Sequence, residues 1–128
     1  MILDTSVIIA ILRGEPGFEE LEQKVGQALE VGVGAPTLVE TAIVLAGRTG
    51  SDQLSKLEAF LRRVGAVEIP FGVDHWRHAY GAFWRFGKGR HPAALNFGDC
   101  CSYATAKVAQ RPLLCKGSDF SKTDLELA

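Results

Sequence analysis

MILDTSVIIAILRG, residues 1–14, is the stretch that decides the fold. It opens with a short apolar run that ends at a carboxylate, Asp4. The residues Val7–Leu12 are apolar nearly all round, and Gly14 is a typical helix terminator. We therefore expect a short buried strand, then Asp4, then a short buried helix.

The rest of the chain alternates between amphipathic stretches and short apolar runs. Ser51 and Asp74 are the expected caps of two of the helices. We expect helices at 16–30, 36–46, 51–64, 74–86 and 96–110, and strands at 31–35, 66–69, 112–115 and 125–127. This alternation predicts a three-layer α/β/α sandwich with a short, mostly parallel central sheet, forming one domain over residues 1–128.

The overall charge is close to zero. Fourteen Lys and Arg residues against fifteen Asp and Glu residues give a net charge of -1. This balance predicts no general attraction to nucleic acid or to an anionic membrane, although the charges can still be segregated. No apolar run approaches the roughly 20 residues that a membrane span needs. The adjacent Cys100 and Cys101, in a total of three cysteines, favour a reducing compartment, so we expect a cytoplasmic protein without a membrane partner.

Four carboxylates occupy the places where ligands bind in open parallel sheets. Asp4 and Asp119 follow predicted strands, and Glu40 and Asp99 lie in the first turns of predicted helices. The carboxyl ends of parallel strands meet at one edge, so these side chains are candidates for one site. Each also has a plainer explanation: Asp4 as a helix cap, Glu40 as a surface residue, Asp99 as a first-turn acid and Asp119 as a turn residue.

A cluster of carboxylates points to a metal ion. Carboxylates that lie within a few ångströms repel one another unless a cation neutralises them. Ligation by oxygen alone suits Mg²⁺ or Mn²⁺, whereas zinc prefers Cys or His at a spacing that this sequence lacks. We interpret Cys100, Cys101 and Cys115 as small buried hydrophobic residues.

Residues 75–98, which we name the basic arm, contain no acidic residue. Its cations are interleaved with aromatic residues, a mixture that can contact phosphates and stack on unpaired bases. The expected RNA-binding side chains are Arg85, Lys88, Arg90 and His91. For Trp76, Tyr80 and Phe83, the helical spacing favours packing in the core.

The motifs together resemble the PIN-domain family, and within it the VapC-type toxins of type II toxin-antitoxin modules. The resemblance covers nearly the whole chain. It rests on Asp4-Thr5-Ser6, on Pro36 with Glu40, on Asn96-Phe97-Gly98-Asp99 with Ala104, on Lys116-Gly117-Ser118-Asp119-Phe120 and on Thr123-Asp124-Leu125.

The resemblance implies an endoribonuclease that depends on Mg²⁺ or Mn²⁺. The metal-binding acids map onto Asp4, Glu40, Asp99 and Asp119. The chain departs from the family pattern at Ser118, where a second acid or Asn often stands, and this departure bears on whether Asp119 is a direct ligand. The resemblance further implies that Ser6 and Asn96 orient the carboxylates or a bound water.

The same resemblance implies an RNA substrate, a cognate antitoxin whose tail covers the active-site groove, and a homodimer. Val7–Leu12 and Leu54–Val64 are candidate contact surfaces, although core packing explains the same residues. Two other functions stay open. One is a Mg²⁺-dependent phosphatase or phospho-acceptor domain with Asp4 as nucleophile, although the chain lacks the second Asp such proteins usually need. The other is a non-catalytic acidic docking module.

Overall fold

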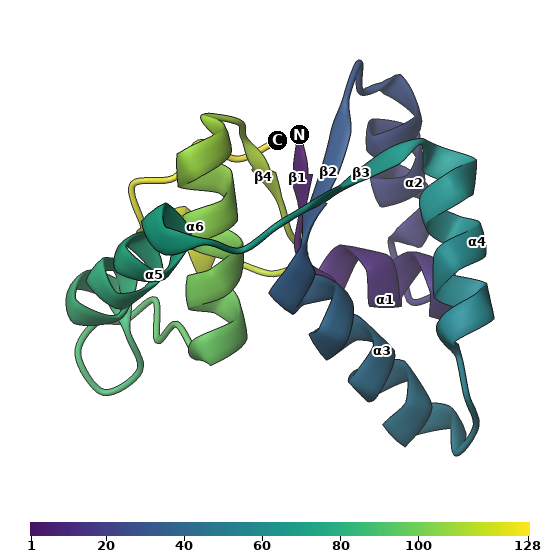
Figure 1. Ribbon diagram of the computed structural model, residues 1–128, viewed down its shortest axis with the longest axis horizontal. Coiled ribbons are helices and arrows are strands. Elements are labelled where there is room, and N and C mark those ends of the chain that lie inside the picture. Colours follow the sequence, from purple (N-terminus) through teal and green to yellow (C-terminus); the bar gives the residue numbers. More distant parts are fainter.

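A parallel sheet of four short strands forms the centre of the computed structural model, which describes residues 1–128 (Figure 1). The strands are β1 (Ile2–Leu3), β2 (Val31–Gly34), β3 (Ala66–Ile69) and β4 (Leu113–Leu114). Their order in the sheet is β3-β2-β1-β4, and each neighbouring pair is parallel. The chain therefore adds strands on one side of β1 and then crosses to the other side for β4.

Helices cover both faces of this sheet (Figure 1). They are α1 (Thr5–Arg13), α2 (Phe18–Gln27), α3 (Ala35–Thr49), α4 (Leu54–Val64), α5 (Val73–Phe86) and α6 (Phe97–Ala109), followed by the short 3-10 helix η1 (Phe120–Lys122). The helices α1, α2 and α4 lie on one side, and α5 and α6 lie on the other. The predicted three-layer sandwich with a parallel sheet is confirmed.

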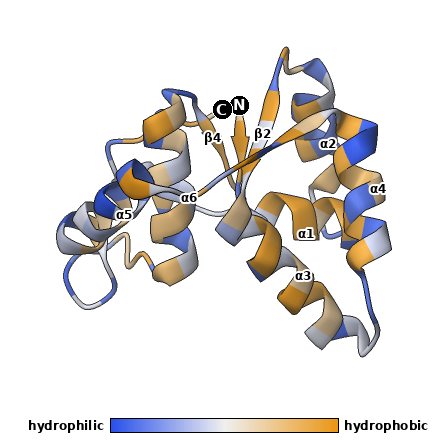
Figure 2. Ribbon diagram, viewed as in Figure 1, coloured by the Kyte–Doolittle hydropathy of each residue, from blue (hydrophilic) through white to orange (hydrophobic).

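Two apolar cores result, one on each face of the sheet. The alternation of side chains along a strand sends Leu3 and Leu114 into the core beneath α1, α2 and α4. Their neighbours Ile2 and Leu113 enter the core beneath α5 and α6. The strands and α1 are the most hydrophobic segments and lie in the middle of the molecule (Figure 2). Burying each such side chain contributes about 1.5–3 kcal/mol, so both cores stabilise the sheet edge where the strands end.

Helix α1 is an interior element. It ends at Gly14, which has a φ of 61° and donates its backbone N–H to the last turn. Val7 is fully buried, as are its apolar neighbours through Ile11. In α4, Leu57, Phe60 and Leu61 fill the same core, although Leu54 stays exposed. Core packing therefore explains Val7–Leu12 and most of Leu54–Val64, and the expectation of a contact surface on α1 is wrong.

Two expected helix caps are also wrong. The backbone N–H of Leu54 donates to Oδ1 of Asp52 at 2.9 Å, so Asp52 and not Ser51 supplies the acceptor at the start of α4. A carboxylate is a stronger acceptor than a hydroxyl at this position. Helix α5 begins one residue earlier than expected, and Asp74 lies in its first turn rather than at its cap.

The end of the chain contacts the sheet without forming a full strand. Leu113 donates its N–H to the carbonyl of Glu126 at 2.9 Å, and Ala128 donates to the carbonyl of Leu113 at 2.9 Å. These bonds make one isolated bridge between Leu113 and Leu127. The strand expected at 125–127 is therefore a single bridged residue. No helix is long and apolar enough to cross a membrane.

The aromatic side of α5 faces outward, so the core packing expected there is wrong. Trp76, Tyr80 and Phe83 are 53%, 56% and 39% exposed. Helix α5 instead turns Ala82 and Phe86 into the core beneath it. Small side chains on the inner side of α5 let it approach α6 closely, and this packing leaves the larger rings outside.

Candidate active site

Asp4 lies at the carboxyl end of β1 and is 6% exposed. Its Oδ2 accepts hydrogen bonds from the backbone N–H of Ser6 at 3.0 Å and from Ser6 Oγ at 2.6 Å. Its Oδ1 accepts from Ser102 Oγ at 2.7 Å. Asp4 is therefore both the N-cap of α1 and a carboxylate held in one orientation at the sheet edge. The sequence predicted Asp4 either as a helix cap or as a carboxylate of the site, and the structure shows it in both places at once.

A layer of buried hydroxyl groups lies behind Asp4. Ser102 Oγ is 3.2 Å from Thr37 Oγ1, and Thr41 Oγ1 donates to the carbonyl of Thr37 at 2.7 Å. All three residues are at most 2% exposed. Sequence reasoning missed them, because a hydroxyl inside a helix carries no local signal that it touches a carboxylate. Their partners become visible only when α3 and α6 pack together.

Glu40 extends from α3 toward the start of α6. Its Oε1 accepts a hydrogen bond from Thr5 Oγ1 at 2.5 Å. On its other side it touches the backbone of Gly98, where an added Cβ would clash with Glu40 Oε2. Only glycine permits this approach, so Gly98 of the Asn96-Phe97-Gly98-Asp99 motif is explained by the position of the Glu40 carboxylate.

Asp99 is fixed in the first turn of α6 by reciprocal bonds with Asn96. The Asp99 N–H donates to Asn96 Oδ1 at 2.9 Å, and the Asn96 N–H donates to Asp99 Oδ2 at 3.0 Å. Burial raises the pKa of Asp99 to about 6, with further increases from the charges of Asp4, Glu40 and Asp119. The predicted acids are thus close enough to influence one another.

Asp119 occupies a different position from the other three acids. It precedes η1, its side chain is 62% exposed, and its Oδ1 is 4.0 Å from Lys122 Nζ. The residues that line the cleft do not include it. Its charge still contributes to the raised pKa of Asp99, so it lies at the edge of the cluster.

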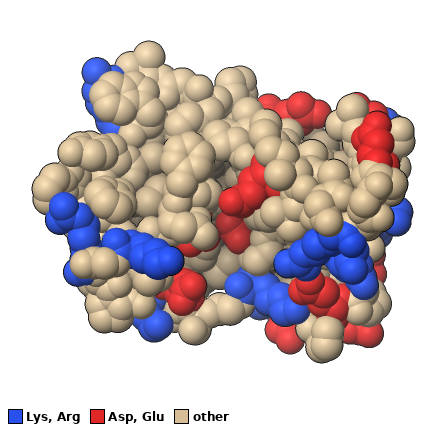
Figure 3. Space-filling view, turned by 90° about the horizontal axis from the view of Figure 1, so that it is seen from below, with Lys and Arg blue, Asp and Glu red and all other residues tan.

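The cleft itself lies between the two halves of the molecule at the carboxyl edge of the sheet. Figure 3 shows acidic side chains in a central hollow, with Lys and Arg on both sides of it. Asp4, Glu40 and Asp99 contribute their carboxylates. The complete lining is Asp4, Thr5, Ser6, Ile9, Glu15, Glu40, Val44, Arg48, Asn96, Asp99 and Lys116. Sequence reasoning did not place Glu15, Arg48 or Lys116 in the site.

The donor set of the cleft suits a hard divalent cation. Asp4, Glu40 and Asp99 offer oxygen ligands only, and none of them forms an ion pair with a Lys, Arg or His. No three His, Cys, Asp or Glu side chains lie close enough together to hold an ion on their own. Mg²⁺ usually takes one or two carboxylates, with water or substrate phosphate at its other positions, and this open arrangement fits that habit.

The cysteines do not add sulfur ligands to the cleft. All three are free. Cys100 and Cys101 are buried, as expected of small hydrophobic residues, whereas Cys115, also expected to be buried, is only half-buried because it follows β4 at the sheet edge. Burial raises the pKa of the Cys100 thiol to about 11, so the neutral thiol predominates near pH 7.

The comparisons with known proteins agree with this geometry. Residues 1–126 match the family described as PIN domain. The chain belongs to the PIN-domain family. Ribonuclease VapC36 of Mycobacterium tuberculosis is 42% identical to this PIN domain over 127 residues, which are 98% of this chain and 91% of the relative. The resemblance inferred from the motifs is confirmed.

Two solved structures share the fold. Mycobacterium tuberculosis VapC20, described as a sarcin-ricin loop cleaving toxin, matches this PIN domain with a TM-score of 0.79 and 18% identity, covering 99% of this chain and 97% of that one. A toxin-antitoxin complex from Klebsiella pneumoniae matches with a TM-score of 0.74 and 17% identity, covering 99% and 95%. At these identities the likeness shows the fold alone.

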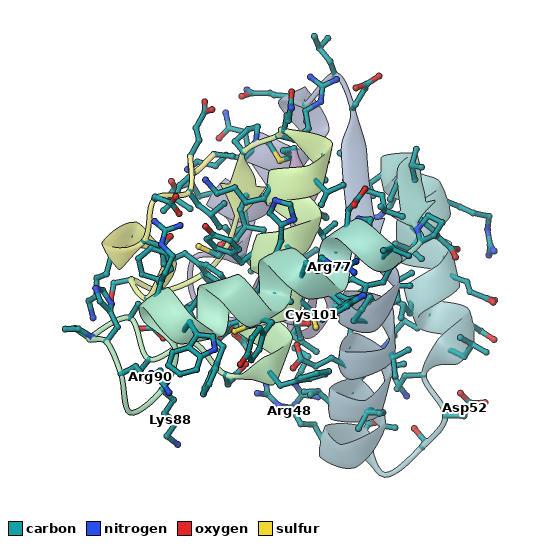
Figure 4. The ribbon with its side chains drawn as sticks, turned by 60° about the vertical axis from the view of Figure 1, so that its left-hand side comes forward. Arg48, Asp52, Arg77, Lys88, Arg90 and Cys101 are labelled. Atoms are coloured by element: carbon teal, nitrogen blue, oxygen red, sulfur yellow. The ribbon has the colours of Figure 1, made fainter.

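The four side chains of the basic arm that were expected to bind RNA fall into two pairs. Arg85 binds Asp124 at 3.2 Å, and the half-buried His91 accepts from the backbone N–H of Ala93 at 3.0 Å, so both hold the local structure. Lys88 is exposed beside the aromatic side of α5, and the Arg90 guanidinium lies 3.7 Å from the centre of a Trp84 ring. Figure 4 shows Lys88 and Arg90 together on the loop after α5.

Proposed function

We propose that this PIN domain is an endoribonuclease, the toxin of a type II toxin-antitoxin module, which hydrolyses RNA phosphodiester bonds with Mg²⁺ or Mn²⁺. One observation carries the proposal. The Asp4, Glu40 and Asp99 carboxylates line one cleft, and none of them forms an ion pair, in a chain whose 42% identical relative is named a ribonuclease.

Each residue of the cleft has a proposed task. Asp4, Asp99 and Glu40 supply oxygen ligands to the ion, with water or substrate phosphate completing its coordination, and Asp119 approaches it from the exposed edge. Ser6 and Asn96 fix the carboxylates of Asp4 and Asp99 through the hydrogen bonds described above. When bound, the ion would lower the pKa of a water and neutralise charge that develops on the phosphate oxygens. Direct attack by water requires no ribose 2′-OH.

The proposed protein partners are an antitoxin and a second copy of the chain. An antitoxin tail with a basic side chain would complement the unpaired acids of the cleft. The aromatic side of α5 borders an apolar groove of about 490 Å³, which a second copy would cover. We place the activity in the cytoplasm, where the three free cysteines stay reduced.

The decisive experiment is cleavage of RNA by the purified chain. We expect cleavage with Mg²⁺ or Mn²⁺, none with EDTA, and none in the Asp99→Asn variant at unchanged far-UV circular dichroism. Cleavage that persists in EDTA or in Asp99→Asn would overturn the proposal. Calorimetry with Mn²⁺ separates an acidic docking module, which need not bind the ion at a defined site. Turnover of small phosphoesters with a covalent aspartyl intermediate would favour a phosphatase instead.

A further inference from the structure

Three charged residues on the wall of the cleft have no task in the proposed function. Glu15 Oε1 binds Arg48 at 3.0 Å, and Glu15 Oε2 binds Lys116 Nζ at 2.8 Å. We name these three residues the clamp. They come from three separate parts of the chain: the turn after α1, the last turns of α3 and the segment after β4. In Figure 4, Arg48 lies on the side of α3 that faces the beginning of α6.

The clamp is connected to Asp4 through two hydrogen bonds. The backbone N–H of Lys116 donates to Ser6 Oγ at 2.9 Å, and Ser6 Oγ donates to Asp4 Oδ2 at 2.6 Å. Asp4 follows β1 and Lys116 follows β4, so both lie where the strand order reverses. In open α/β sheets this point is where ligands bind.

The charges of the clamp leave one positive charge in excess, because two cations share one carboxylate. The hydrogen bond from Lys116 lowers the pKa of Glu15, which therefore stays ionised at neutral pH. The side chains of Arg48 and Lys116 remain 50% and 38% exposed. Arg48 spends one of its five N–H donors on Glu15, so donors remain for a ligand.

Stability alone is a weak reason for such an arrangement. Exposed ion pairs contribute about 0–1 kcal/mol, because water screens the attraction and the long side chains lose freedom. The excess positive charge of Arg48 and Lys116 is better explained by binding of an anion in the cleft. Phosphates are the anions that Arg and Lys bind best, and an RNA substrate presents one at every nucleotide.

We propose that Arg48 and Lys116 together bind an RNA phosphate that flanks the scissile one. The inference rests on the proposed ribonuclease function and adds a specific contact to it. Figure 3 shows Lys and Arg side chains on both sides of the central acids, so a single strand crossing the acids would meet cations on both sides. Glu15 bridges the two cations on the wall of the cleft and competes with the phosphate for their N–H donors.

The test compares Arg48→Ala and Lys116→Ala with the unchanged chain. Lys116→Ala keeps the backbone N–H that donates to Ser6, so the Asp4 network is preserved. We expect KM with Mn²⁺ to rise about tenfold in each variant, with a smaller change in kcat, because a charged hydrogen bond to substrate is lost. In EDTA, the slope of log K against log salt for single-stranded RNA should fall in magnitude by about 0.7 per lost contact.

Three further variants sharpen the test. Arg63→Ala breaks a matched Arg–Glu pair, with Glu22 at 2.7 Å, on α4 outside the cleft, and should leave KM and the salt slope unchanged. Arg48→Lys should retain the salt slope. Glu15→Gln removes the competing carboxylate, so RNA should bind at least as tightly as before, opposite in sign to Arg48→Ala.

Two outcomes would contradict the proposed phosphate contact of the clamp and leave the proposed ribonuclease function intact. In the first, the unchanged chain cleaves RNA, and Arg48→Ala and Lys116→Ala lower Tm but leave KM and the salt slope as they were. In the second, RNA binding is unchanged and inhibition by an antitoxin is lost, which would assign the clamp to a protein partner. If the unchanged chain cleaves no RNA with either ion, the proposed function itself fails.

Discussion

The acidic cleft and the basic arm differ in what determines the position of their side chains. In the cleft, Asp4 sits at a strand end, Asp99 in the first turn of α6 and Glu40 in the second turn of α3, so the backbone carries each carboxylate to the sheet edge. In the arm, a side chain faces outward or inward according to the rotation of α5 about its axis. Backbone topology can be predicted from the sequence, whereas the rotation of α5 about its axis depends on its packing against α6.

Loss of an acid in the cleft should have the largest effect. Asp99→Asn should lower RNA cleavage by at least about 100-fold, since even residues that only support metal ligands cost 10–100-fold. The matched control is Asp124→Asn, which removes an acid bound to Tyr103 at 2.7 Å and to Lys107 at 3.1 Å, away from the cleft. That variant should cleave RNA normally and lose about 1 kcal/mol of stability. Equal activity in the two variants would show that Asp99 is no more important for cleavage than an acid outside the cleft.

Replacing a glycine by alanine should be harmful in the cleft and stabilising in the basic arm. Gly98→Ala places a Cβ against the Glu40 carboxylate, which must move aside, so we expect reduced cleavage with only a small loss of stability. Gly81 in α5 has no heavy atom within 4 Å of an added Cβ. Gly81→Ala should therefore stabilise the chain by up to about 1 kcal/mol. Chemical denaturation measures both, and a neutral Gly98→Ala would contradict the close approach of Glu40.

The metal-free cleft should make stability depend on pH. Burial raises the pKa of Asp99 from its ordinary value of 3.8 to about 6, so the folded chain binds more protons than the unfolded chain between these values. The free energy of unfolding should therefore fall as the pH rises from 4 to 7, by an amount on the order of 2 kcal/mol. Denaturation in EDTA at pH 5 and pH 7 measures this difference. Asp99→Asn should flatten the curve, and an equally steep curve in that variant would assign the dependence to another group.

An exposed ring of the arm should matter least for folding. Tyr80→Ser should change the stability of the monomer by no more than about 0.5 kcal/mol, because the side chain is 56% exposed. It should weaken self-association, which analytical ultracentrifugation measures. Ala82, which is buried beneath the same helix, provides the contrast: Ala82→Ser should destabilise the fold by placing a hydroxyl in the core. A large loss of monomer stability in Tyr80→Ser would restore the core interpretation of the ring.

Much of the fold and the main acids could be predicted because they follow local rules. The apolar strands, Gly14 and the position of Asp4 are fixed by neighbouring residues, and parallel topology brings Asp4, Glu40 and Asp99 to one edge. The clamp could not be predicted, because Glu15, Arg48 and Lys116 are far apart in sequence and meet only through packing. Arg85 was expected to contact RNA, yet its partner Asp124 lies 39 positions away, beyond any local pattern.

The buried hydroxyl layer of Thr37, Thr41 and Ser102 has a consequence for how the cleft changes its ionic state. Ser102 donates to Asp4, and in the Ser102–Thr37 pair either hydroxyl can be the donor, so this pair can readjust by bond rotation when a cation arrives at Asp4 or leaves it. No helix has to move, and no second charge has to be buried. The empty and loaded forms should therefore share one backbone, and whatever binds across the cleft meets a surface that already has its final shape.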